Sequence, residues 1–431
     1  MQIESHEVIN QHIKIAEKNR LEEYFPYIAT VVLLFQVPFQ VLLIDNIHLY
    51  IIIIMIGFLF LSRLKNSSVV KLDGIRKWIF IIILWIPISA VFLPSLLISM
   101  VGSLDYLLPL LFWVLFLDLY EDRFSFQKYL TFTFALTAIM ALFGIYQRFF
   151  DPGLFGIMES LNTRYSFETI NIVKVFRISS FCSSTQVFSF LMGANFVVAV
   201  ELWDYIRLNK LLRFICISLI AFSGILAGGK VFALMFLIGV SLSLGRFIRT
   251  GRLRINTIFT IGISFIVFAS LLIVLRYFDI INVFSNAFSR TFIAVLDYGG
   301  FLSQEGSRQN AMSTVFQSSL LNAVFGHGLG TSSYSAYNLL GSRIEFSRVT
   351  LESYVLSVYY EMGVIGLFFF FGFYLRAVVI SFKKKYLMSI IAIFAALFVT
   401  PSYFSISMFP ITGFFVFMYY NKMMNEIEVV R

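Results

Sequence analysis

The sequence predicts an all-α polytopic integral membrane protein with about twelve transmembrane helices. Hydrophobic residues make up 59% of the chain and charged residues only 13%, whereas soluble domains average about 45–50% and about 25%. The hydrophobic residues also occur in runs of about 16–24, which is long enough to cross a hydrocarbon core as helices. Helices are expected because a spanning segment must satisfy its backbone hydrogen bonds internally.

The predicted spans follow these hydrophobic runs in order. Polar, charged or glycine-containing segments separate each run from the next. The spans are expected at 25–44, 46–62, 78–93, 103–119, 129–147, 186–203, 213–228, 231–245, 257–275, 359–381, 387–400 and 406–420.

The N-terminus is expected to be cytoplasmic. The residues before Tyr24 are polar and mixed in charge, so we expect no cleavable signal peptide and a first helix that acts as a signal anchor. With this orientation, 22 Lys and Arg residues lie in the inside segments and ten lie outside. This bias follows the positive-inside rule, and an even number of spans returns the C-terminus to the cytoplasm. The net charge of +9 is therefore attributed to residues that orient helices, not to nucleic-acid binding.

The chain divides into three parts. Residues 1–275 hold the first nine spans and an outside loop at 148–185, residues 276–350 form a long, partly helical outside loop, and residues 351–431 hold the last three spans. Cys182 and Cys216 fall at opposite ends of different spans, so no disulfide is expected.

The ten outside cations depart from the usual bias. Each one is either an ordinary surface residue of a long loop or part of a site for an anionic ligand. Arginine suits phosphate because its planar fork makes bidentate, charge-assisted hydrogen bonds. The ten are Arg148, Arg164, Lys174, Arg177, Lys230, Arg276, Arg290, Arg308, Arg343 and Arg348.

Two of these cations stand beside helix starts. Arg177 precedes a run of serines that leads into the sixth span, and exposed amides at a helix N-terminus favour anions. Lys230 follows Gly228 and Gly229 in the turn between the seventh and eighth spans. A cation at that depth is a functional candidate, although it can also snorkel to the outer headgroups.

The loop at 276–350 carries the densest pattern. Arg308 precedes an amphipathic stretch at 309–321, and a glycine-rich turn follows at 325–330. The turn is not a dinucleotide fingerprint, because no parallel sheet surrounds it. His327 within the turn is either a base or a solvated histidine.

The segment after the loop contains acidic and aromatic candidates in an apolar setting. Glu352 and Glu361 are candidate general bases, since burial makes a carboxylate more basic, and Glu352 can alternatively cap a helix N-terminus. Tyr334, Tyr337 and Tyr354 either stack on sugars or form an interfacial aromatic belt.

These motifs, in this order, resemble the O-antigen ligase/polymerase family of bacterial inner-membrane enzymes. The resemblance covers roughly the second half of the chain. It rests on Arg308, the Phe325–Gly330 turn, Glu352-Ser353 and the Glu361-Met-Gly-Val-Ile-Gly-Leu367 string. Arg177 and Gly229-Lys230 stand where the family has an arginine before the sixth span and a Ser-Arg pair. The departures are Lys230 in place of arginine and Glu352-Ser353 in place of the histidine and asparagine of the ligase branch, which favours a polymerase.

The resemblance implies a glycosyltransferase-C-like architecture and inverting, metal-independent glycosyl transfer without cofactors at the outer membrane face. The substrates would be oligosaccharide repeat units on undecaprenyl diphosphate, and the product O-antigen of lipopolysaccharide or capsule. The lipid bilayer, a flippase and a chain-length regulator would be the partners. Glu352, Arg308 and Arg177 would be catalytic. The residues that would bind diphosphate or glycan are Lys230, Arg276, Arg290, Arg343, Arg348, His327 and Tyr354.

Three alternatives remain open from the sequence. An O-antigen ligase is disfavoured because Glu352-Ser353 replaces the histidine and asparagine of the ligase branch. A lipid-linked oligosaccharide flippase or transporter would show internal repeats and mid-membrane polar residues, which are not evident in the sequence. A purely structural membrane protein leaves the outside cations unexplained.

Overall fold

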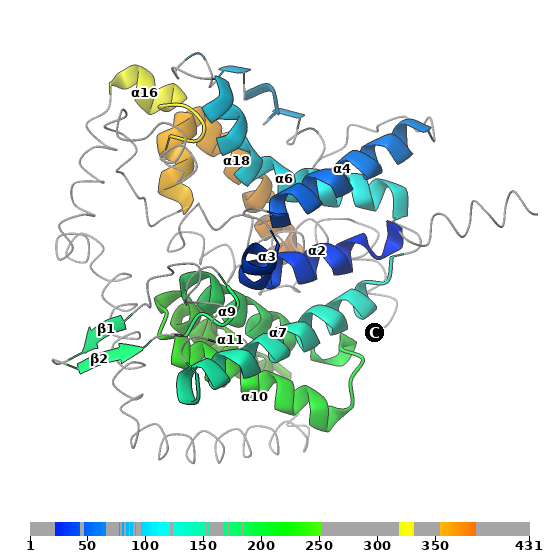
Figure 1. Ribbon diagram of the computed structural model, residues 1–431, viewed down its shortest axis with the longest axis vertical. Helices are drawn as coiled ribbons and strands as arrows, with labels where there is room; N and C mark the ends of the chain where they lie inside the picture. The colour runs from blue at the N-terminus through cyan, green and yellow to red at the C-terminus, as the bar shows by residue number, and fades with distance from the viewer. Residues whose placement is uncertain are drawn as a thin grey trace, which may run out of the picture.

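The structure is a computed structural model that is predominantly helical in the parts it describes (Figure 1). It describes residues 22–43, 47–65, part of 77–91, 96–120, 124–151, 154, 167–170, 173–176, 178–182, 185–250, 319–331 and 354–384. The predicted spans at 257–275, 387–400 and 406–420 lie outside these residues, and the span at 78–93 is described in part.

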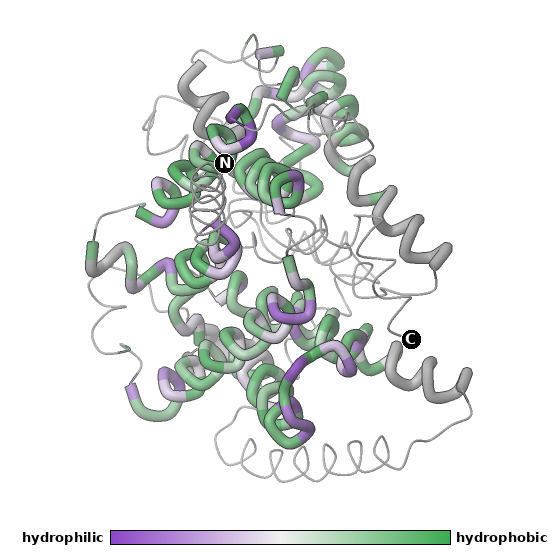
Figure 2. Tube along the Cα trace, turned by 90° about the vertical axis from the view of Figure 1, so that its right-hand side faces the viewer, coloured by the Kyte–Doolittle hydropathy of each residue, from purple (hydrophilic) through white to green (hydrophobic). Residues whose placement is uncertain are grey.

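The helices follow the predicted spans closely in the described residues. Three of them, α4, α7 and α10, are long and apolar enough to cross a membrane. The described helices are predominantly hydrophobic along their length in Figure 2. Their bounds are α2 (Phe25–Leu34), α3 (Gln36–Leu42), α4 (Ile47–Lys65), α6 (Leu96–Tyr120), α7 (Phe126–Phe149), α9 (Thr185–Glu201), α10 (Lys210–Ala227), α11 (Lys230–Thr250), α16 (Leu320–Phe325) and α18 (Tyr354–Lys384), with a 3-10 turn η1 (Trp203–Tyr205).

The helices form two groups with α2 and α3 between them (Figure 1). One group contains α7, α9, α10 and α11, with α9 packed against each of the other three. In the other group α4 packs on α6, and α16 packs on α18. Small residues permit the close approach inside the first group: Gly193 of α9 faces Met235 of α11, and Gly224 of α10 faces Phe232.

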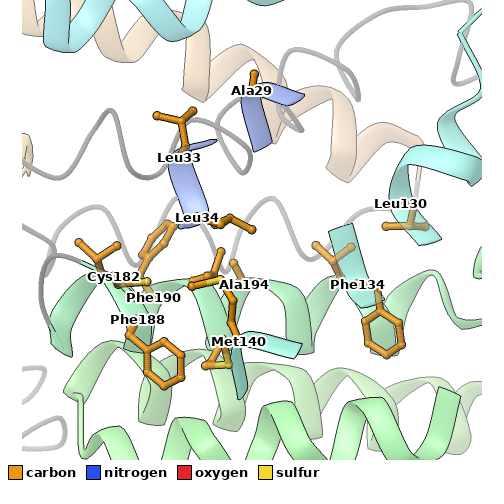
Figure 3. Close-up of a cluster of buried hydrophobic side chains, with 14 of the residues drawn as sticks. Ala29, Leu33, Leu34, Leu130, Phe134, Met140, Cys182, Phe188, Phe190 and Ala194 are labelled. Carbon is orange, nitrogen blue, oxygen red and sulfur yellow. The ribbon is translucent and has the colours of Figure 1, made fainter. Parts of the chain in front are cut away.

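One part of the core lies where α7, α9 and the α2–α3 segment meet, and the same buried cluster continues onto α6. Figure 3 shows Phe188 and Phe190 of α9 near Met140 of α7 and Leu34 of α2. Phe188, Phe190 and Met140 are fully buried. Because α9 is buried on nearly all its faces, it is the central helix of its group.

The expected single span at 25–44 is instead two helices, which corrects that prediction. The chain leaves helical geometry at Phe35, with φ −98° and ψ 35°. The ring of Pro38 explains the break, because it clashes with the carbonyl four residues earlier and supplies no N–H. The freed amide of Val37 donates to the carbonyl of Phe181 at 3.3 Å.

The loop at 148–185, predicted to lie outside, contains a β-hairpin that the sequence did not lead us to expect. Strand β1 (Phe167–Ile170) pairs antiparallel with β2 (Val173–Phe176), with Ile170 opposite Val173. Each strand has only four residues. The hairpin is thus a local addition to a helical protein.

Polar contacts join helix ends that the predicted topology assigns to the same side. Arg63 at the end of α4 forms an ion pair with Asp118 at the end of α6. The amide of Arg207 donates to Thr131 Oγ1 at 2.8 Å, which links the η1–α10 connection to the start of α7. Each pair falls on the predicted inner side. Cys182 and Cys216 are buried free thiols, as expected.

Candidate functional site

The structure describes one of the ten predicted site residues in full. His327 is described with its side chain, whereas Lys230 and Tyr354 are described by their backbone, as the first residues of α11 and α18. The other seven, which include the three proposed catalytic residues, lie outside the described residues: Glu352, Arg308, Arg177, Arg276, Arg290, Arg343 and Arg348.

The predicted glycine-rich turn follows α16 directly. Ser319 caps α16 by accepting a hydrogen bond from the amide of Asn322 at 3.2 Å. Gly326, Gly328 and Gly330 then adopt φ angles of +84°, +105° and +89°. Side-chain-bearing residues rarely adopt such angles, which explains why glycine stands at every second position.

Another glycine, Gly363, interrupts α18. Gly363 has φ +67° and ψ −170°, so the helix stops and restarts there. The interruption removes the helical partners of the carbonyls of Tyr360 and Glu361. The amides of His327 and Gly328 replace those partners, at 2.8 and 3.0 Å. An interrupted helix is tolerated in an apolar setting only where other protein groups satisfy its backbone, and the glycine-rich turn does so.

The close backbone approach also requires glycine at three positions. A Cβ on Gly326 would collide with the carbonyl of Glu361, and a Cβ on Gly363 with the carbonyl of Val324. A Cβ on Gly102 of α6 would collide with the backbone of Gly330. The glycine-rich turn is thus in backbone contact with both α18 and α6.

His327 is held against Tyr360 by three contacts. Its amide donates to the Tyr360 carbonyl, its ring Nδ1 lies 3.2 Å from the same oxygen, and its ring stacks on the Tyr360 ring with centroids 4.1 Å apart. Burial lowers the pKa of His327 below its usual value, and the hydrogen bond to the Tyr360 carbonyl acts in the opposite direction. Within 326–331, His327 is partly exposed and the other residues are buried.

The first turns of α18 carry a buried polar face. Ser357, Tyr360 and Glu361, at spacings of three and four residues, are each at most 1% exposed. The hydroxyls of Ser357 and Tyr360 have no hydrogen-bond partner among the described residues. Buried polar groups without partners are costly, so this face is a functional candidate in its own right. Sequence reasoning noted only Glu361 here; the polar spacing within an apolar run was the available signal.

The segment that follows Arg177 is anchored by a glutamine. Gln147 of α7 accepts hydrogen bonds through Oε1 from the amides of Ser179 and Ser180, at 3.0 and 2.9 Å. Ser180 Oγ donates to the carbonyl of Met140 at 2.9 Å. Gln147 was not singled out from the sequence, although a glutamine that ends an apolar span is a recognisable signal. These bonds fix the backbone immediately after Arg177.

The turn that leads into Lys230 is built at the α9–α10 contact. Gly228 ends α10 in the left-handed region, with φ +60°. The amide of Phe232 in the first turn of α11 donates to Ser189 Oγ of α9 at 3.2 Å. Ser223 Oγ of α10 donates to the carbonyl of Ala141 of α7 at 2.7 Å. Helices α7, α9 and α10 thus together position the start of α11.

Three places in the structure adjoin predicted site residues: the segment after Arg177, the start of α11, and the glycine-rich turn. The first two belong to one helix group. The segment after Arg177 and the start of α11 both contact α7 or α9, whereas α16 and the glycine-rich turn lie on the other side of α2 and α3 (Figure 1). Helix α3 bridges toward the first group through the bond between Val37 and Phe181. Among the described residues, no three His, Cys, Asp or Glu side chains lie close enough together to hold a metal ion.

Comparison of the chain with protein-family models, curated proteins and solved structures finds no match.

Proposed function

We propose that this protein polymerises oligosaccharide repeat units carried on undecaprenyl diphosphate into a surface polysaccharide, O-antigen or capsule. One observation supports the proposal most. The two strings that carry the resemblance, Phe325–Gly330 and Glu361–Leu367, are joined by a backbone hydrogen bond from the amide of Gly328 to the carbonyl of Glu361, although these two residues are far apart in the sequence.

The reaction would be an inverting glycosyl transfer. A hydroxyl of the acceptor repeat unit attacks the anomeric carbon of the donor glycan, and the bond from that carbon to the diphosphate oxygen breaks. Glu352 takes the hydroxyl proton as general base, a role worth about 10²–10⁴-fold. The diphosphate leaves with the bonding electron pair, and Arg177, Lys230 and Arg308 stabilise the charge that develops on it.

The site would face away from the cytoplasm in the inner membrane. The supporting observation is the distribution of Lys and Arg along the sequence, which favours an outside position for both long loops. A twelve-helix, glycosyltransferase-C-like architecture is part of the same proposal. Helices α4, α7 and α10 are compatible with it because they are long and apolar enough to span.

A lipid-linked oligosaccharide transporter is the second candidate, favoured by the interruptions at Phe35 and Gly363. Interrupted helices are typical of transporters, where they line a substrate site near mid-membrane. Here loop backbone fills both interruptions, through Phe181 and through His327 and Gly328. Interruptions that loop backbone already fills are better suited to holding loops in place than to lining a substrate site.

The experiment is substitution in a strain that depends on this protein for its polysaccharide. Glu352→Gln, Arg177→Ala and Arg308→Ala should each eliminate long chains while a product with one repeat unit persists. Chain length is read on a gel, and protein abundance by immunoblot. Arg254→Ala, predicted on the inner side, is the matched control and should leave chain length unchanged.

The two candidates give opposite results for the single-unit product. Loss of a transporter stops delivery, so even one repeat unit fails to reach the surface. Wild-type chain lengths in all three variants at normal abundance would disprove the polymerase assignment.

A further inference from the structure

The starts of α7 and α10 lie side by side, at the end that the predicted topology assigns to the cytoplasmic face. Helix α10 packs on α7 along its length. Arg207, just before α10, reaches the first turns of α7 through two hydrogen bonds. Its amide donates to Thr131 Oγ1 and its side-chain Nε donates to Gln127 Oε1, each at 2.8 Å. Both helices therefore begin at one end of the same helix group.

Basic residues gather at this end. Residues 124–131 and 203–213 together contain four Lys or Arg residues and one acidic residue, Asp204. Three of the four cations are exposed and form what we call the basic patch: Lys128, Arg207 and Lys210. None of the three forms an ion pair with a carboxylate among the described residues. The positive charge of the basic patch is thus not neutralised in this part of the structure.

The basic patch lies where helices disfavour cations. The start of an α-helix carries a partial positive charge, which acidic residues stabilise and basic residues do not. Neither α7 nor α10 has an acidic residue in its first turn. Lys210 is instead the first residue of α10, and Lys128 is the third residue of α7. An anion at the basic patch would relieve this repulsion.

Arg207 is held in place without losing its charge. Its side-chain partner, Gln127, is neutral, so the hydrogen bond restricts the guanidinium and leaves the positive charge uncompensated. A guanidinium has five N–H donors, of which this bond uses one. The others suit bidentate, charge-assisted hydrogen bonds to phosphate oxygens.

Apolar side chains follow the cations in α10. Leu212 and Ile215, three residues apart on one side of the helix, are 42% and 43% exposed. Trp203 of η1 lies 5.2 Å from the guanidinium carbon of Arg213, and tryptophan is common at the level of lipid headgroups. This surface therefore fits a ligand in which an anionic headgroup adjoins hydrocarbon chains.

We propose that the basic patch binds an anionic phospholipid, with the lipid phosphate at Arg207 and Lys210 and the acyl chains along Leu212 and Ile215. The proposal is independent of the polymerase function. The orienting effect of Lys and Arg explains on which side of the membrane these residues lie. It does not explain why they converge on two neighbouring helix starts, whereas a bound lipid phosphate does.

Native mass spectrometry of the full-length protein in detergent tests the proposal, because it counts bound lipids. Wild type should retain phosphatidylglycerol in preference to phosphatidylcholine, which has similar chains but no net charge. Arg207→Gln and Lys210→Gln should each weaken the apparent affinity for phosphatidylglycerol about fivefold, the contribution of one Lys or Arg near an anionic lipid. Arg207→Lys keeps the charge without the planar fork and should fall between Arg207→Gln and wild type.

Lys65→Gln is the matched control. Lys65 is exposed and predicted to lie on the same side, but it is in the last turn of α4, where a cation is favourable. Its substitution should leave the affinity for phosphatidylglycerol unchanged. Thermal unfolding in phosphatidylcholine nanodiscs checks that the variants fold. Should Arg207→Gln unfold, Lys210→Gln decides the outcome, since the exposed Lys210 side chain makes no ion pair among the described residues.

Three results would overturn the proposal. The first is equal retention of phosphatidylglycerol and phosphatidylcholine by wild type. The second is a wild-type affinity in a folded Lys210→Gln variant, or the same loss in Lys65→Gln. The third is displacement of phosphatidylglycerol by inorganic phosphate at equal concentration, which would mean that the patch binds a free anion and not a lipid.

Discussion

Glycine is required where the glycine-rich turn meets α18. Gly326 has φ +84° and ψ 178°, a region that is open almost only to glycine, and its Cα faces the carbonyl of Glu361. At Gly326, as at Gly363, backbone conformation and tertiary contact both exclude a side chain.

Gly326→Ala should therefore destabilise the protein by about 1–3 kcal/mol, because it strains the backbone and displaces α18. The matched control is Gly57→Ala in α4, where no atom lies within 4 Å of an added Cβ. That control should be neutral or stabilising by up to about 1 kcal/mol, since alanine favours helix. Thermal unfolding in detergent measures both. Equal melting temperatures for the two variants would contradict the close packing of the turn.

At the scale of the helices, the two interruptions at Phe35 and Gly363 are the main feature. At Phe35 and at Gly363 a helix stops, and in each case backbone from a long loop, predicted to lie outside, supplies or receives the missing hydrogen bonds. One of these loops contains Arg177 and the other contains His327. The interruptions thus anchor these two loops to the helices around them.

Gln147 allows the anchoring of the loop that contains Arg177 to be tested, because its Oε1 accepts hydrogen bonds from two buried amides. Gln147→Ala leaves both amides without an acceptor, at a cost of about 1–3 kcal/mol for each unsatisfied group. We expect a lower melting temperature and shorter polysaccharide chains, since the backbone after Arg177 is released. Gln147→Glu retains an acceptor oxygen and should preserve more of both properties. A wild-type chain length in Gln147→Ala would separate this anchor from function.

Local patterns explain which features were predictable from the sequence. The helices at 47–65 and 126–149 follow from uninterrupted apolar runs, and the turn at 325–330 follows from its glycines. The split between α2 and α3 was missed because Pro38 lies within an otherwise continuous apolar run. The pairing of His327 with Tyr360 was not predictable, because sequence periodicity does not indicate which distant carbonyl an amide will meet. The helical spacing of Ser357 and Tyr360 could be seen in the sequence, but the sequence did not indicate what their hydroxyls would contact.

At the scale of the whole molecule, the proposed polymerase requires both long loops to lie on one side of the membrane. In the described residues, Arg63 pairs with Asp118 and Arg207 contacts Thr131, each within the predicted inner side. These contacts determine which helix ends lie together. The bias of Lys and Arg toward one side predicts which of the two sides is cytoplasmic.

Cysteine labelling tests that direction. Leu211 near the start of α10 is 70% exposed and is predicted inside, and Leu320 at the start of α16 is 86% exposed and is predicted outside. A membrane-impermeant maleimide should label Leu320→Cys in intact cells and Leu211→Cys only after permeabilisation. The native Cys182 and Cys216 are buried and should stay unlabelled. Labelling of Leu211→Cys in intact cells would reverse the orientation and remove the outer-face site.

The most direct measurement is a product ladder from purified protein in nanodiscs that contain undecaprenyl-diphosphate-linked repeat units. Wild type should convert single units into products that grow by whole repeats and release undecaprenyl diphosphate, and Glu352→Gln should leave the single units unchanged. A wild-type protein that leaves the repeat units intact, or that transfers finished chains to a lipid A core without lengthening them, would contradict the proposed polymerase.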